Sequence, residues 1–99
     1  MSVYFADQRS PQLQKAIEAN TLIILPVGQV EEHGNHLPVS TDTAIVEGVA
    51  QRLAKALVAE NLPTLVMPAI WSGYSTKDMI RWPGILRFLW IWFMMFVVR

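Results

Sequence analysis

The order of hydrophobic and polar positions predicts two helices and two strands in alternation. Residues 11–19 place apolar side chains at helical spacing behind Ser10 as a capping residue and a proline at the first helical position, so we expect a short helix there. Residues 21–27 form an unbroken aliphatic run that is too short for a helix and contains the breaker Pro26. Such a run predicts a strand buried on both faces, as in parallel sheets.

A second helix and a second strand follow a long polar loop. Helical periodicity resumes after residues 28–42, and Thr41 or Asp42 is the expected cap of a helix that runs to about Glu60. Residues 62–67 form another short apolar run, which predicts a second strand. Strand, loop, helix and strand make one βαβ unit with a right-handed crossover, so the predicted fold class is α/β with a parallel sheet.

Residues 86–99, LRFLWIWFMMFVVR, are apolar except for Arg87 and Arg99. The uncharged run 88–98 is shorter than the ~20 residues of a membrane-spanning helix, so we expect no transmembrane span. Three interpretations of this tail stay open: an element packed on the sheet, an interfacial membrane contact, or an exposed aggregation-prone segment. On a monomer the tail would make a large apolar patch, so we expect a homo-oligomer or another form of self-association.

The charge balance and the absence of cysteine limit the partners and the metal ligands that this chain can have. The chain carries 8 basic and 8 acidic residues, and this balance offers no electrostatic footprint for a nucleic-acid partner. It has no cysteine, so a metal ion would have to be held by His, Asp and Glu. The first residues, MSVYFADQRS, lack a basic stretch followed by an apolar one, so no signal peptide is expected and the default location is cytoplasmic.

The loop of residues 28–42 is the strongest candidate for a functional site. It leaves the carboxyl end of the first predicted strand, where open α/β sheets bind their ligands, and it holds both histidines of the chain. Glu31 and His33 are two positions apart, so in an extended segment both side chains point to the same side. Asp42 can close back on them from the start of the next helix. Two carboxylates and an imidazole suit Zn, Mn or a related divalent ion.

Two other interpretations of this loop stay open. A Glu-Glu-His-Gly sequence is often only a solvated turn, and Asp42 can serve simply as a helix cap. A mononuclear site made of Glu31, His33 and His36 is the poorer alternative. The glycine and the proline within this loop exclude the helix on which an HExxH-type motif depends.

Residues 24–43, ILPVGQVEEHGNHLPVSTDT, resemble the N-terminal motif of the creatininase family of amidohydrolases, approximately LPVGSxEQHGxHLPxxTDT. The likeness continues through LPTLVMPAI to GYSTKDMIRWPG at residues 73–84, which is similar to the family's GYSxxHxxFPG. It implies a creatininase-like three-layer α/β/α fold, truncated after the first βαβ region. Residues 1–85 would be the N-terminal part of that domain, and residues 86–99 a divergent apolar tail, for which an aberrant end is one hypothesis.

The resemblance also implies a reaction and its site. In the family, the Glu of the E-x-H pair binds one metal ion, its His binds a second, and the Asp of TDT bridges both; the matching positions here are Glu31, His33 and Asp42. Two divalent ions, Zn or Mn, would activate a water and polarise the carbonyl of an amide or cyclic amide in a small-molecule substrate. Glu32 replaces the usual glutamine. His36 matches a frequent family histidine, which would orient a ligand or contact the substrate, or would make only a structural hydrogen bond inside the loop.

The sequence departs from the family pattern downstream. The family supplies a further His and a Glu from later segments, one of them resembling NGHGGN, and this chain has no histidine after His36. Two functional hypotheses from different classes follow. The first is a metal-dependent amidohydrolase; the second is a catalytically inactive truncated fragment that binds metal weakly or associates with itself.

Overall fold

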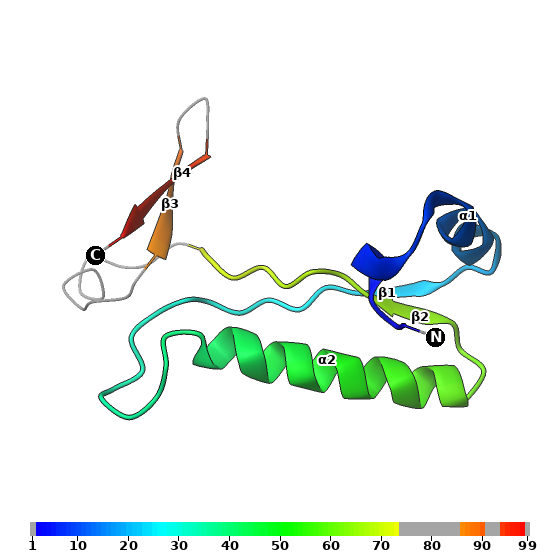
Figure 1. The fold of residues 1–99 in the computed structure, drawn as a ribbon, viewed down its shortest axis with the longest axis horizontal. Coiled ribbons are helices and arrows are strands. Elements are labelled where there is room, and N and C mark those ends of the chain that lie inside the picture. Colours follow the sequence, from blue (N-terminus) through cyan, green and yellow to red (C-terminus); the bar gives the residue numbers. More distant parts are fainter. Residues whose placement is uncertain (1, 74–85, 91–93, 99) are drawn as a thin grey trace. The chain divides into compact units, whose positions relative to one another are not determined.

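The computed structural model describes residues 2–73, 86–90 and 94–98 (Figure 1). The described residues belong to two compact units, Met1–Pro26 with Val46–Ala69, and Val27–Ile45 with Ile70–Arg99. In chain order the elements are the 3-10 helix η1 (Phe5–Asp7), α1 (Ser10–Glu18), β1 (Leu22–Ile24), α2 (Thr41–Ala59), β2 (Thr64–Val66), β3 (Leu86–Trp90) and β4 (Met94–Val98).

The first unit holds a small parallel sheet. β1 pairs in parallel with β2, in a register that runs from Leu22 opposite Thr64 to Ile24 opposite Val66. Tyr4 makes a single parallel bridge to Val66, so among the described residues β2 lies between Tyr4 and β1. The predicted α/β class with a parallel sheet is confirmed.

Both strands are shorter than the apolar runs that predicted them, because Pro26 and Pro63 have no N–H to donate to a ladder. The prediction that the first strand is buried on both faces is wrong for the described residues. Leu22 and Ile23 are 44% and 46% exposed, and only Ile24 packs against the core. The reason is that, within the described residues, β1 pairs with β2 alone and Ile24 is its one side chain that packs against the core.

The two helices span nearly the residues that the hydrophobic periodicity predicted. The residues at their first turns differ from the prediction. α1 begins at Ser10 itself, with Arg9 as the residue before it. α2 begins at Thr41, so Ser40 precedes the helix, whereas Thr41 or Asp42 was the expected cap. The hydroxyl of Thr41 donates instead to a loop carbonyl three residues back. Asp42 therefore lies inside the first turn, where an acidic side chain interacts favourably with the helix dipole.

The core of the first unit is built from small side chains. Ala50 and Ala54 on α2 pack with Val3 and Val66, and Ile24 contacts this cluster. Alanines on the buried face let the helix backbone come close to the sheet, but they bury little apolar area, so the unit is thinly stabilised. None of the helices in the described part of the chain is long and apolar enough to cross a membrane.

The apolar tail contributes an antiparallel pair of strands to the second unit. β3 pairs with β4, in a register that runs from Leu86 opposite Val98 to Trp90 opposite Met94. The three interpretations of the tail depend on side chains that are outside the described part of the chain. The same holds for residues 74–85, which include most of the segment resembling GYSxxHxxFPG.

Candidate metal centre

The loop after β1 is held by backbone hydrogen bonds within the second unit. Val30 donates its N–H to the carbonyl of Trp71 over 2.7 Å, which fixes the chain immediately before the candidate ligands. Glu31 donates its N–H to the carbonyl of Val39 over 3.1 Å and thereby ties the two ends of the intervening loop together. Glu31 and the residues that follow it are thus returned toward the start of α2.

Gly28 brings this loop against the first turn of α2. A Cβ atom at Gly28 would lie 2.7 Å from the Cα of Thr43 and 2.8 Å from its backbone nitrogen, which is closer than real Cβ contacts. Only glycine therefore allows this approach. Because Thr43 follows Asp42 directly, the contact sets the distance between the loop and the Asp42 carboxylate.

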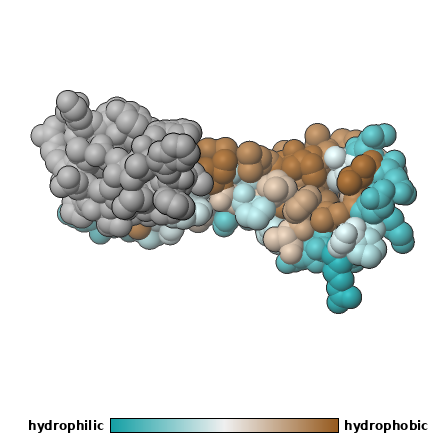
Figure 2. All heavy atoms as spheres, turned by 90° about the horizontal axis from the view of Figure 1, so that it is seen from above, coloured by the Kyte–Doolittle hydropathy of each residue, from teal (hydrophilic) through white to brown (hydrophobic). Residues whose placement is uncertain are grey.

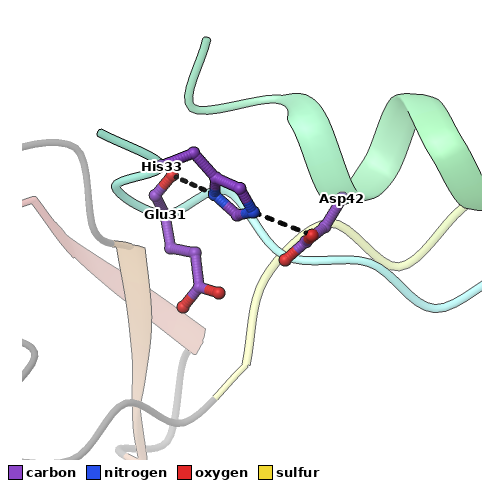
Figure 3. A group of neighbouring side chains, drawn as sticks. All are labelled: Glu31, His33 and Asp42. Atoms are coloured by element: carbon purple, nitrogen blue, oxygen red, sulfur yellow. Dashed lines mark hydrogen bonds and ion pairs between the residues drawn. The ribbon is translucent and has the colours of Figure 1, made fainter. Parts of the chain in front are cut away.

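Glu31, His33 and Asp42 lie together at this point (Figure 3). Each offers a donor atom, and these atoms all lie within 4.8 Å of one another. The three residues are half-buried, so their donors are partly shielded from water but still reachable from solvent. Glu31 and His33 lie on the same side because they are two positions apart in an extended segment. The loop then returns to the start of α2, which brings Asp42 next to them.

The imidazole of His33 is bonded on both sides. Its Nδ1 lies 3.2 Å from the backbone oxygen of Glu31, and its Nε2 lies 3.0 Å from Oδ1 of Asp42. Both partners are acceptors, so in the absence of a cation they favour the doubly protonated ring. The hydrogen bond to Glu31 is the larger cause, and the Asp42 carboxylate adds to it; together they raise the pKa of His33 above its usual 6.5.

The Glu31 carboxyl is also perturbed. Partial burial raises its pKa above the usual 4.5, and the negative charge of Asp42 raises it further, whereas His33 opposes the shift. Two carboxylates that repel each other beside an imidazole make a place where positive charge is favoured. A divalent cation would relieve that repulsion.

The pKa of His33 can be tested in the metal-free chain. Its imidazole is expected to titrate above 6.5 in an NMR pH titration, and Asp42→Asn is expected to move the midpoint down because it removes a negative charge at 3.0 Å. Because the pKa of His33 is higher in the folded chain than in the unfolded chain, its protonation stabilises the fold at pH values below the unfolded-state pKa. This contribution is lost as the pH rises through the folded-state pKa. A midpoint that stays unchanged in Asp42→Asn would contradict the assignment.

The two remaining candidates lie outside this three-residue group. The Glu32 carboxylate accepts a hydrogen bond from the N–H of Gly34 over 2.6 Å, so it stabilises the turn of the loop. Gly34 has a positive φ of 79°, which glycine adopts at low cost. His36 is exposed, and its ring lies next to Gly34. The role of both side chains in binding stays a prediction.

The sequence analysis did not single out two buried hydroxyls in the same unit. Oγ1 of Thr43 and Oγ of Ser72 have no hydrogen-bond partner among the described residues. Ser72 is only 4% exposed, and it follows Trp71, whose carbonyl holds Val30. Burial depends on tertiary packing, so the sequence carried no signal for Ser72, and for Thr43 it carried only its place in the TDT motif.

Known proteins are similar in sequence to the part of the chain that contains this loop. The creatininase family, described as creatinine amidohydrolase, matches residues 6–91. A 3-dehydro-scyllo-inosose hydrolase from Thermotoga maritima is 34% identical over 82 residues, which cover 83% of this chain and 25% of that protein. A mycofactocin precursor peptide peptidase from Mycobacterium tuberculosis is 45% identical over 58 residues, which cover 54% of this chain and 23% of that protein. The chain therefore spans about a quarter of the length of these curated relatives.

Solved structures agree with the sequence relatives. A manganese form of creatininase superposes with a TM-score of 0.76 at 26% identity, covering 86% of this chain and 33% of that one. A zinc–zinc form of a creatininase mutant superposes with a TM-score of 0.74 over the same shares at 26% identity. These neighbours confirm the predicted creatininase-like fold class. The match over residues 6–91 and the shared fold together show that this chain belongs to the creatininase family.

Proposed function

We propose that this chain binds a divalent metal ion through Glu31, His33 and Asp42, as its part in amide hydrolysis of the creatininase type. The observation that carries the proposal is the convergence of these three donors within 4.8 Å. The fold and the presence of manganese and zinc in similar structures support it. A dinuclear centre, as the resemblance implies, is part of the proposal, with Asp42 as the shared ligand.

The donor set fits such an ion. The backbone carbonyl of Glu31 holds the proton on Nδ1 of His33, which leaves the lone pair of Nε2 for a cation next to Oδ1 of Asp42. Carboxylate oxygens and an imidazole nitrogen are ligands that zinc and manganese accept. No cysteine competes for softer ions.

The substrate class is a small molecule with an amide or cyclic amide bond. A divalent ion would supply Lewis acidity toward the scissile carbonyl and a lowered pKa for water. Within this chain, His33 and Asp42 would position the ion, and the Glu31 carboxylate would balance its charge. The relatives act on different compounds, including creatinine, so the family alone does not select one.

Titration calorimetry with Mn²⁺ and with Zn²⁺ tests the metal site. The wild-type chain is expected to bind weakly, because only three donors converge in the described part, and His33→Ala is expected to bind at least about 100-fold more weakly. His36→Ala removes the other histidine of the same loop, which lies outside the three-residue group, and is expected to weaken binding far less than His33→Ala does. Equal binding by wild type and His33→Ala would remove His33 from the site.

A second candidate function rests on the same three donors. With three donors and no further group of His, Asp and Glu in the described part, the chain can hold metal without a closed catalytic centre. Turnover of creatinine in the calorimetry samples separates the candidates. We expect metal binding with negligible turnover from the 99-residue chain, whereas robust turnover that disappears in Asp42→Ala would establish the hydrolase.

A further inference from the structure

We draw no further inference here: the strongest candidate, an open cavity of about 470 Å³ in the first unit that α1 and β2 line with Ala16, Thr64 and Leu65, lies in a part of the chain where hydrophobic residues reach the surface (Figure 2), and nothing in the structure shows what covers it.

Discussion

Asp42→Asn is expected to abolish measurable binding of Mn²⁺ and Zn²⁺. The substitution keeps the shape of the side chain but removes the negative charge that lies 3.0 Å from His33 Nε2. A direct ligand should matter at least as much as the outer partners of a metal site, whose loss costs about 10- to 100-fold in affinity. In the wild type, metal at 100 times its dissociation constant should add about 2.7 kcal/mol to the free energy of unfolding. Asp42→Asn should lose that gain in a thermal melt.

Glu47→Gln is the matched control for this experiment. Glu47 is exposed on the same helix and is not part of the three-residue group, so its replacement removes one negative charge without touching a donor. Asp42→Asn should also lower the metal-free stability by about 0.3 to 1 kcal/mol, because the first turn of α2 loses a favourable charge. The loss of metal binding must therefore be read from the difference between melts with and without metal. If Asp42→Asn keeps the metal-induced gain of the wild type, Asp42 is not a ligand.

Gly28→Ala is expected to destabilise the chain, and Gly48→Ala to stabilise it. The new Cβ at Gly28 would meet the backbone of Thr43 at 2.7 Å, and backbone cannot give way as a flexible side chain can. Overpacking of this kind typically costs about 1 to 3 kcal/mol. At Gly48, inside α2, nothing lies within 4 Å of the new Cβ. Alanine is there favoured over glycine by about 0.8 to 1 kcal/mol of helix propensity.

Urea denaturation measures both changes on one scale. The opposite signs make each variant the control of the other, since both add the same methyl group. Gly28→Ala should also weaken metal binding, because the loop can no longer approach Asp42 as closely. Equal stability of Gly28→Ala and the wild type would show that the loop does not lie against the first turn of α2.

Local sequence signals were sufficient to predict α1, α2, β1 and β2 and to name candidate ligands, whereas the strands β3 and β4 were not predicted. Helical spacing and proline positions placed α1 and α2 within one or two residues, because both signals depend on local geometry. The pairing of Glu31 with His33 also followed from spacing, since extended residues two apart share a side. The family resemblance was confirmed by the match over residues 6–91.

Tertiary structure decided what depends on neighbours distant along the chain. An all-aliphatic run looks the same whether a strand is central or at an edge, so only the pairing of β1 with β2 revealed that Ile23 is half-exposed. The close approach of Gly28 to Thr43 and the burial of Ser72 have no local signature either. Sequence spacing determined which residues share a face, whereas the return of the loop to α2 brought Asp42 within 3.0 Å of His33, because that distance is set by packing between segments and not by the order of residues.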